Sequence, residues 1–511
     1  MIVADWAHGY NIEVPYTYGY YRETSPQWLR WATYLGGRKP PSGKRIRYLE
    51  LGCGQGFNLL LHASSHPSME FLGIDFNPSH IAHAEELVRL SGLTNVKFVE
   101  GDFLELEKEW PKEYGTFQYV VLHGIWSWVS KDVRKALINI LRKVVVPGGI
   151  VYIPYNALPG WLPGSIVRET LLAFKKISQL PASSSATEGL KVLKRIEELG
   201  AAVFSSLPAL KPRLENFLRQ DPAYLVGEFM HETHRLFWVH EVIEEALSAK
   251  LYYAATCTLP ENFLPALLPE DARRFIMDFS HPVFRLFLTD LFINQAFRRD
   301  LYQKGVVQPS LIEQMREILS EKFIKISEPP PEWKFTLSFG EVTARREIYE
   351  PILEEVSKGA KSVEELLKLQ VFKERGLASL IQAMSLLLDR GVVAPYNEGN
   401  NPDYTRKLVK TIIQRVDEGR NYSYLPCPIT GLGVFTTLLD LLTLSSYLEG
   451  GRNVEQLAAR THSKLVRLGR NLVKDGRELT DENERLEYLT QVSQDFLNKT
   501  LPALRSLKII E

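Results

Sequence analysis

The 511-residue chain contains only three cysteines, Cys53, Cys257 and Cys427, and they lie far apart in the sequence. This spacing excludes a disulfide framework and a cysteine-based zinc site. The sequence has no apolar run near the ~18 residues of a membrane span, and its N-terminus lacks the basic and apolar regions of a signal peptide. Basic and acidic residues balance at 61 each, so net charge favours neither nucleic acid nor an anionic membrane. We therefore expect a cytoplasmic protein without a membrane span or a nucleic-acid partner.

A glycine-rich stretch near residue 50 organises the chain. Residues 46–51 form a predicted apolar strand, Gly52, Gly54 and Gly56 follow at alternating positions, and a helix is predicted over 57–64. Glycine is required where a backbone turns sharply or approaches a ligand closely. A strand, a tight turn and a helix N-terminus in this order form a crevice that binds ligands. With Glu50 ahead of the glycines, the spacing differs from the dinucleotide fingerprint G-x-G-x-x-G.

Strands and helices then alternate. Further strands are predicted at 71–75, 96–103, 117–122 and 150–154, with helices over 78–90 and 131–145 between them. This alternation predicts an α/β fold with a parallel sheet covered on both faces. Glu50, Asp75 and Asp102 all lie at the carboxyl ends of predicted strands, where crevice ligands bind. Each acid also has a structural interpretation: Glu50 could bond turn amides, Asp75 could cap the next helix, and Asp102 could terminate a strand.

Changes in pattern predict the domain organisation. The expected parts are an aromatic-rich cap at 1–41, an α/β domain at 42–260 with a helical insertion at 160–237, a helical middle region at 261–328, a winged-helix-like domain at 332–400, and a helical C-terminal domain at 401–511. Residues 251–256 are the expected sixth strand, and a helix is expected across 286–302. Pro329, Pro330 and Pro331 mark the later boundary. The helices after it lack a basic recognition face, which favours protein packing over DNA binding.

Several longer motifs carry a family resemblance. They are the stretch 50–56 with Asn58, residues 71–75, His123-Gly124-Ile125-Trp126-Ser127-Trp128-Val129, Tyr155-Asn156-Ala157-Leu158-Pro159-Gly160-Trp161, residues 290–292 with 297–299, and 421–431. Together they resemble bacterial class I S-adenosylmethionine (AdoMet) methyltransferases with a methyltransferase regulatory domain, a family that includes protein lysine methyltransferases acting on outer-membrane proteins. Gly227 and Gln295 depart from the family pattern, and both departures lie in the regulatory part rather than at the cofactor site.

The resemblance implies a Rossmann-like domain, AdoMet as cofactor, S-adenosylhomocysteine (AdoHcy) as product, and no metal. It implies cofactor-binding roles for Glu50, Gly52, Gly54, Gly56, Asp75, Phe76, Asp102, Phe103 and His123. In this assignment Glu50 orients the loop and the amino group of AdoMet. Asp75 accepts hydrogen bonds from the ribose hydroxyls, and Asp102 accepts one from the adenine amine, with Phe76 or Phe103 beside the adenine ring.

The catalytic residues that the resemblance implies follow the fourth and fifth strands: His123, Trp128, Tyr155 and Asn156. Trp126 and Trp161 are further candidate walls of a channel for the methyl acceptor. Ordinary core packing is the alternative for the tryptophans, and a backbone hydrogen bond is the alternative to a base for His123. Among the N-terminal aromatics, Tyr18, Tyr20 or Tyr21 is a candidate lid over the cofactor, with core packing again as the alternative.

The acceptor is predicted to be a protein lysine. Its ammonium has an ordinary pKa near ~10.4, which burial beside aromatic rings and a sulfonium would lower. Transfer to a small metabolite is the alternative reaction, and AdoMet binding without turnover is the non-enzymatic alternative. The helical additions favour a large substrate, but they also serve dimerisation, so a homodimer stays open. His231, Glu232 and His234 do not match the zincin pattern H-E-x-x-H, because the histidines are three apart.

Overall fold

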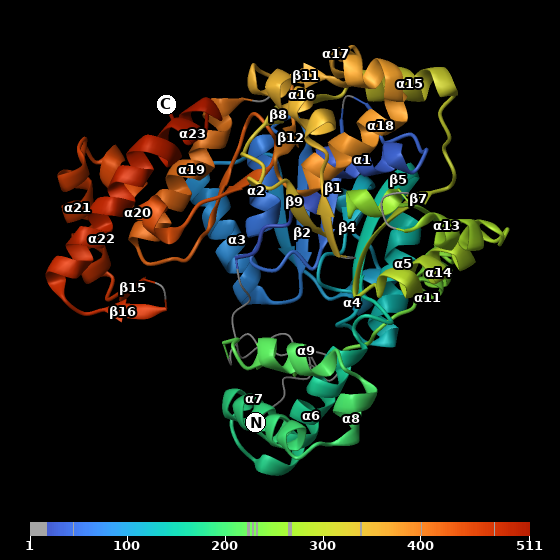
Figure 1. Cartoon of the computed structure of the whole chain (residues 1–511), viewed down its shortest axis with the longest axis horizontal. Coiled ribbons are helices and arrows are strands. Elements are labelled where there is room, and N and C mark those ends of the chain that lie inside the picture. The colour runs from blue at the N-terminus through green and yellow to red at the C-terminus, as the bar shows by residue number, and fades with distance from the viewer. Residues whose placement is uncertain are drawn as a thin grey trace.

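The computed structural model describes residues 18–43, 45–221, 225–226, 229–230, 233–263, 268–337, 340–399, 401–474 and 476–511. Gly227, His231 and Glu232 lie outside these ranges, as do residues 1–17 of the expected cap. Figure 1 shows a central sheet with one helical group beside it, a second above it and a third projecting below it.

The central sheet has seven strands in the order β3-β2-β1-β4-β5-β7-β6. Its parallel part comprises β1 (Arg47–Leu51), β2 (Glu70–Asp75), β3 (Val96–Glu100), β4 (Phe117–Val121) and β5 (Val145–Asn156). The strand order reverses between β1 and β4, and such a reversal opens a crevice at the carboxyl edge of a sheet. The predicted Rossmann-like α/β fold is confirmed.

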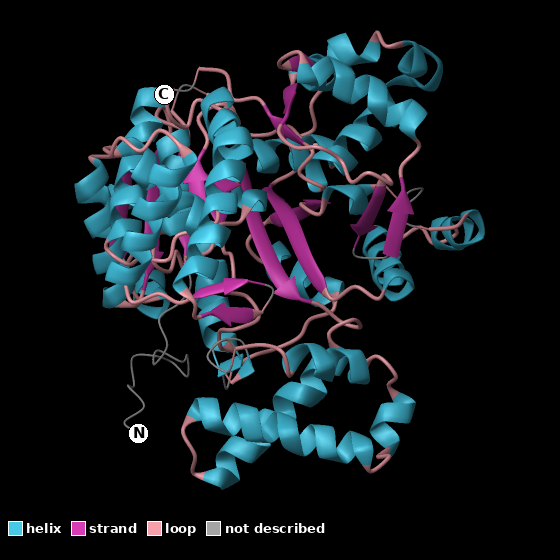
Figure 2. Ribbon diagram, turned by 60° about the vertical axis from the view of Figure 1, so that its left-hand side comes forward, coloured by secondary structure: helices cyan, strands magenta, loops and turns pink. Residues whose placement is uncertain are grey.

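Helices cover both faces of the sheet, as Figure 2 shows. One face packs against α2 (Phe57–Ser65) and α3 (Pro78–Ser91), and the other against α4 (Phe103–Lys108), α5 (Lys131–Val144) and α11 (Val239–Leu247). Strand residues alternate between the faces, so Tyr48 joins the first core while Leu49 joins the second. The N-terminal helix α1 (Pro26–Leu35) has Ser25 as its N-cap and buries its tryptophans on the first core.

Strand β7 (Phe297–Lys304) corrects the expectation of a helix across 286–302. Helices α13 (Glu270–Met277) and α14 (Pro282–Ile293) precede it, and α14 ends at Asn294 in a left-handed conformation. The chain then enters the sheet between β5 and β6 (Leu251–Thr256), antiparallel to both. The charges at 298–300 resembled the polar side of a helix, but Arg298 and Asp300 are buried as an ion pair.

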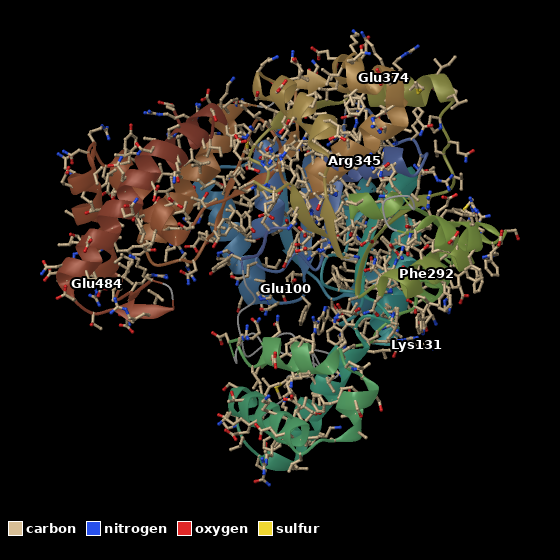
Figure 3. The ribbon with its side chains drawn as sticks, in the orientation of Figure 1. Glu100, Lys131, Phe292, Arg345, Glu374 and Glu484 are labelled. Atoms are coloured by element: carbon tan, nitrogen blue, oxygen red, sulfur yellow. The ribbon has the colours of Figure 1, made fainter. Side chains whose placement is uncertain are left out.

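The insertion after β5 forms a helical lobe with a core of its own. It contains α6 (Leu162–Ser178), α7 (Ala182–Glu198), α8 (Ala202–Ser206) and α9 (Leu210–Phe217). The lobe lies beyond the carboxyl edge of the sheet. In Figure 3, Glu100 at the end of β3 and Lys131 at the start of α5 lie on the side that faces the lobe.

A small three-stranded sheet crosses the predicted boundary at 329–331. Strand β8 (Lys322–Lys325) pairs with both β11 (Lys361–Ser362) and β12 (Val393–Pro395). The other elements of this group are α15 (Leu311–Ser320), β9 (Lys334–Leu337), β10 (Gly340–Thr343), α16 (Arg346–Ser357), α17 (Val363–Leu367) and α18 (Gln370–Asp389), which is kinked at Gly376. Because β8 precedes the prolines, they do not separate this group from the chain before it.

The C-terminal part is mostly helical, as predicted. Its elements are α19 (Pro402–Asp417), β13 (Tyr424–Pro426), β14 (Gly433–Phe435), α20 (Leu438–Leu448), α21 (Val454–Arg467), β15 (Leu472–Lys474), β16 (Arg477–Leu479), α22 (Glu482–Asp495) and α23 (Leu501–Ser506). Helix α19 packs on α2 and α3, and one hydrophobic core extends from Trp28 to Ile510. Among the described helices, none is long and apolar enough to cross a membrane.

Candidate active site

A cavity opens where the carboxyl ends of β1, β2 and β4 meet. Its walls come from the glycine loop, the turns after β2 and β3, the loop after β4 and the N-terminal segment. The lining residues are Gly19, Tyr21, Glu50, Gly52, Cys53, Gly54, Gln55, Phe57, Asn58, Asp75, Phe76, His80, Asp102, Phe103, His123, Gly124, Ile125, Trp128, Val129, Ser130 and Val133. Every residue predicted to bind the cofactor is in this set except Gly56, which lies in the chain between two lining residues.

The loop between β1 and α2 requires glycine at Gly52 and Gly56. Both have left-handed backbones, with φ of +77° and +76°, which strain any residue with a Cβ. Space is also short: a Cβ on Gly52 would lie 2.1 Å from Ile125 Cδ1, and one on Gly56 would lie 2.5 Å from Ala84 Cβ. The turn can therefore bring its backbone to the cavity only because these side chains are missing.

Glu50 presents an unsatisfied oxygen at the cavity. Its Oε1 accepts a hydrogen bond of 2.9 Å from Asn58 Nδ2, while its buried Oε2 has no hydrogen-bond partner among the described residues. Burial raises the pKa of Glu50 to about 8, and the negative charge of Asp75 adds to the increase. A buried carboxylate oxygen without a donor fits a ligand that carries a cationic amino group.

Asp75 and Asp102 organise the turns that carry them. Asp75 Oδ2 accepts from the Gly54 amide at 2.8 Å and Oδ1 from the Asn77 amide at 3.0 Å, while Asn77 itself caps α3. Asp102 caps α4 by accepting from the Leu104 amide at 2.7 Å. A carboxylate has about four acceptor sites, so both acids combine this structural role with a place in the cavity wall.

Aromatic rings form the wall beyond the loop after β4. The Tyr21 ring stacks on His123 with centroids 3.5 Å apart, and the ring centroid of Tyr152 lies 6.2 Å from that of His123. Burial lowers the pKa of His123 to about 3, so its imidazole is neutral. Trp128 lines the same cavity, and its ring centroid lies 4.5 Å from that of His234. This wall is therefore uncharged and largely apolar.

Two family models match the chain, one described as a methyltransferase domain over residues 42–197 and one as a predicted methyltransferase regulatory domain over 221–304. An uncharacterized protein of Synechocystis, sll1526, is 33% identical over 518 residues, covering 99% of both chains. The chain belongs to the class I AdoMet-dependent methyltransferases with a regulatory domain. The methyltransferase is also 31% identical to the uncharacterized protein RP028 of Rickettsia prowazekii, over 46% of this chain and 92% of that one.

A solved structure shares the fold of nearly the whole methyltransferase. PKMT2 from Rickettsia typhi, determined in complex with AdoHcy, aligns with a TM-score of 0.68 over 95% of this chain and 98% of that one. The two sequences are 20% identical. The likeness therefore covers the central sheet, the helical lobe and the C-terminal half together.

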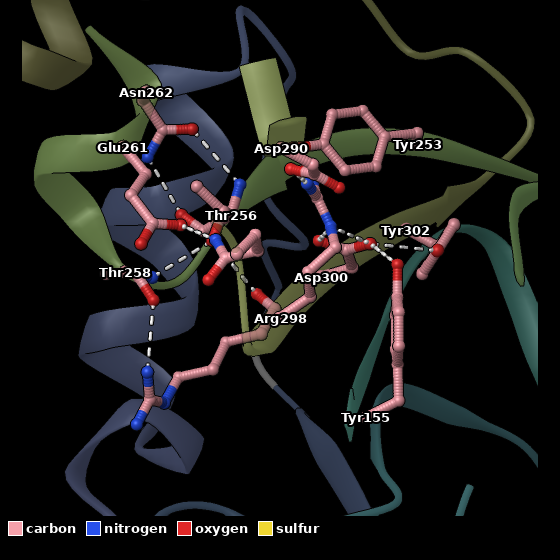
Figure 4. A network of polar contacts seen from close by, with 12 residues as sticks. Tyr155, Tyr253, Thr256, Thr258, Glu261, Asn262, Asp290, Arg298, Asp300 and Tyr302 are labelled. Carbon is pink, nitrogen blue, oxygen red and sulfur yellow. Dashed lines mark hydrogen bonds and ion pairs between the residues drawn. The ribbon is translucent and has the colours of Figure 1, made fainter. Parts of the chain in front are cut away.

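Tyr155 lies away from the cavity, contrary to the expectation that it helps to form the acceptor channel. It is 1% exposed in the core on the α5 and α11 face of the sheet, and its hydroxyl donates to Asp300 Oδ2 at 2.7 Å. Figure 4 shows the buried network around it, in which Arg298 bonds both Asp290 and Asp300 and Tyr302 also donates to Asp300. The alternation of side chains along β5 directs Tyr155 to this face.

Asn156 and two of the predicted tryptophans surround His234 near the cavity. Asn156 Nδ2 lies 2.9 Å from His234 Nε2, and the Trp161 ring centroid lies 4.9 Å from that of His234. Trp128 belongs to both this cluster and the cavity wall. Trp126 is fully buried in the core, as its structural alternative predicted. Within the described ranges, no group of three or more His, Cys, Asp or Glu side chains could hold a metal ion.

Among the three candidate lid tyrosines, the structure brings only Tyr21 into the cavity wall. Tyr18 packs on Tyr422, and Tyr20 packs on His62 and Tyr424. Asn58 also lines the cavity, although the sequence predicts no separate role for it. A polar side chain within an apolar helix was the signal that could have indicated one. The departure at Gln295 is accommodated by a hydrogen bond of 2.8 Å from its Nε2 to Glu261.

Proposed function

We propose that this methyltransferase methylates lysine side chains of a protein substrate. The observation that carries the proposal is the wall of uncharged rings formed by Tyr21, His123 and Trp128 beside the glycine loop. Aromatic faces attract an approaching ammonium, and burial among them favours its neutral form. Only the neutral amine has the lone pair that methylation requires.

The residues of the glycine loop and the neighbouring turns would hold AdoMet. Glu50 Oε2 would accept a hydrogen bond from the amino group of AdoMet. Asp75 would accept hydrogen bonds from the ribose hydroxyls, and Asp102 would accept one from the adenine amine. Phe76 and Phe103 would lie beside the adenine ring. His123 would border the methyl end. When bound, AdoMet supplies an electrophilic methyl carbon, to which the amine nitrogen bonds while the carbon–sulfur bond breaks and its electron pair stays on sulfur.

Deprotonation of the acceptor would not use His123 as a general base. A useful base has a pKa near the working pH, whereas burial lowers that of His123 to about 3. The amine would lose its proton to water on entering the apolar wall. His123 would then position the amine by ring contact.

The architecture supports a large substrate. The helical lobe of α6 to α9 lies beyond the carboxyl edge of the sheet, on the side where the cavity opens (Figure 3). The sequence motifs resemble those of protein lysine methyltransferases, and the fold matches that of PKMT2 along almost the whole chain.

The test is labelling of a bacterial lysate with purified enzyme and AdoMet that carries a tritiated methyl group. We expect label in protein bands and methyllysine in their hydrolysates. Label found only in the small-molecule extract would reject the proposal in favour of a metabolite acceptor. Label in neither fraction would favour AdoMet binding without turnover.

A variant pair tests the aromatic wall. Trp128→Ala should lower the labelling rate by more than about tenfold and change the Kd for AdoHcy by less than about threefold. Trp110→Ala is the matched control, because Trp110 packs on Tyr114 outside the cavity. An equal loss in both variants would remove the assigned role of Trp128.

A further inference from the structure

We propose that Asn58 is a positioning residue that couples occupancy of the Glu50 carboxylate to the placement of Tyr21, so that the cofactor orders the acceptor wall when it binds. The proposal deepens the proposed function, because it rests on AdoMet at Glu50 and on Tyr21 beside the acceptor. Asn58 lies on the first turn of α2 and is 5% exposed.

The side-chain amide of Asn58 bridges the two walls of the cavity. Its Nδ2 donates to Glu50 Oε1 at 2.9 Å, and its Oδ1 accepts from the backbone amide of Tyr21 at 3.1 Å. Glu50 and Tyr21 both line the cavity, and the Tyr21 ring stacks on His123. One side-chain amide thus connects the Glu50 carboxylate on the cofactor side of the cavity with the Tyr21 backbone on the acceptor side.

The turn that follows Tyr21 is anchored to the same part of the methyltransferase domain. Asn58 Nδ2 also donates to Thr24 Oγ1 at 3.1 Å, and Thr24 Oγ1 lies 2.8 Å from His62 Nε2 on α2. Tyr48 of β1 donates from its hydroxyl to the Thr24 carbonyl at 2.8 Å. With the later residues of the turn fixed by β1 and α2, the Asn58–Tyr21 bond becomes the contact that responds to the state of Glu50.

The charge on Glu50 determines which way the Asn58 amide can face. An ionised carboxylate only accepts hydrogen bonds, so the NH₂ group must face Glu50 and the oxygen must face Tyr21. A protonated carboxyl can also donate, which permits the reversed amide and a lost bond to Tyr21. Burial raises the pKa of Glu50 to about 8, so the protonated form predominates at pH 7 without a ligand. A cationic amino group at Oε2 would restore the ionised form.

Hydrogen exchange of the whole protein measures this coupling directly, since the Tyr21 amide is the donor to Asn58. Exchange of the segment 18–25 is followed by mass spectrometry at pH 7, with and without saturating AdoHcy. We expect AdoHcy to slow exchange of the Tyr21 amide by about tenfold. Calorimetry on the same samples establishes that AdoHcy is bound.

Substitutions separate positioning from a merely structural role. In Asn58→Ala, AdoHcy should still bind while the added protection of Tyr21 disappears. The double variant Glu50→Gln/Asn58→Asp exchanges the amide and the carboxylate between the two positions. The amide introduced at position 50 then donates to the carboxylate introduced at position 58, which also accepts from the Tyr21 backbone amide. This variant should protect Tyr21 with or without AdoHcy, because a carboxylate at position 58 presents an acceptor in either orientation.

Asn262→Ala is the matched control. It removes a side-chain amide that bonds the backbone of Thr256 and Leu259, and it should leave the response of Tyr21 to AdoHcy intact. The coupling is overturned if bound AdoHcy leaves Tyr21 exchange unchanged in the native protein, or if Asn58→Ala keeps the added protection. Neither result depends on the acceptor, so a failure of the lysine proposal in the lysate assay is distinguishable from a failure of the coupling.

Discussion

The affinity for AdoHcy should rise with pH up to about pH 8 because Glu50 must ionise to receive the amino group. In the free protein, burial raises the Glu50 pKa to about 8, so Glu50 is ionised in roughly one-tenth of the molecules at pH 7. The ligand's ammonium favours the ionised form, so binding lowers this pKa. A group that loses its proton on binding makes the affinity increase as the pH increases.

The size of the effect follows from how far the ammonium lowers the pKa of Glu50. An opposite charge in contact lowers a carboxyl pKa by roughly one to three units, which would bring that of Glu50 to roughly 5 to 7 in the complex. Between pH 6.0 and 7.5 the Kd should then fall by roughly threefold for the smallest shift and roughly 20-fold for the largest. Between roughly 0.4 and 0.9 protons should be released per AdoHcy at pH 7.

Isothermal titration in buffers of different ionisation enthalpy measures both quantities. The range stops at pH 7.5 because the α-amino group of AdoHcy starts to deprotonate near ~8. Glu50→Gln removes the titration, so its Kd should vary by less than about twofold over the range. Glu100→Gln is the control, because Glu100 is an exposed acid at the end of β3, which β2 separates from the strand of Glu50. A native Kd that is constant with pH, together with no proton release, would refute this account of Glu50.

Three further predictions concern the loop, the acceptor wall and the core. Gly56→Ala should weaken AdoHcy binding at least about tenfold. Gly92 has a similar left-handed backbone but open space where a Cβ would lie, so Gly92→Ala should lower the free energy of unfolding in denaturant melts by only about 1 kcal/mol. Equal AdoHcy binding by the two variants would contradict the steric argument. His123→Asn should lower the labelling rate without changing the shape of its pH profile between pH 6 and 8, and the loss of a limb near pH 6.5 would instead identify His123 as a base. Tyr155→Phe should lower the free energy of unfolding by about 1–3 kcal/mol, because Asp300 loses a buried hydrogen-bond donor. The same variant should leave the Kd for AdoHcy unchanged, and a changed Kd would show that Tyr155 contributes to the binding site.

The cofactor side of the site was accessible from sequence because its signals are local. Glycines at positive φ and acids at strand ends are spaced by the geometry of one strand–turn–helix unit and its neighbours. The parallel sheet and its helical cover likewise follow from the alternation of strands and helices. These features need no knowledge of contacts between distant segments.

The rest depended on long-range packing, which the pattern of residues does not reveal. Arg298 and Asp300 carry charges that indicate a surface, yet they are buried because Asp290 and Tyr155 satisfy them. That buried pairing lies on β7, and the alternation along β5 brings Tyr155 to the same face of the sheet. The choice of Tyr21 among its neighbours depended in the same way on a hydrogen bond to Asn58, 37 positions along the chain.

The position of β7 in the sheet also determines how late in synthesis the sheet can be completed. Because β7 separates β5 from β6, neither strand has its final neighbour until residue 304 has been made. Until then the hydrogen-bonding edge of β5 is open, and open edges invite pairing with other chains. The shared core, which extends to Ile510, lengthens this interval. The surfaces of α2 and α3 that pack against α19 stay exposed until α19 has been made, late in synthesis. A nascent chain of this length therefore has a long interval in which it would benefit from chaperone protection.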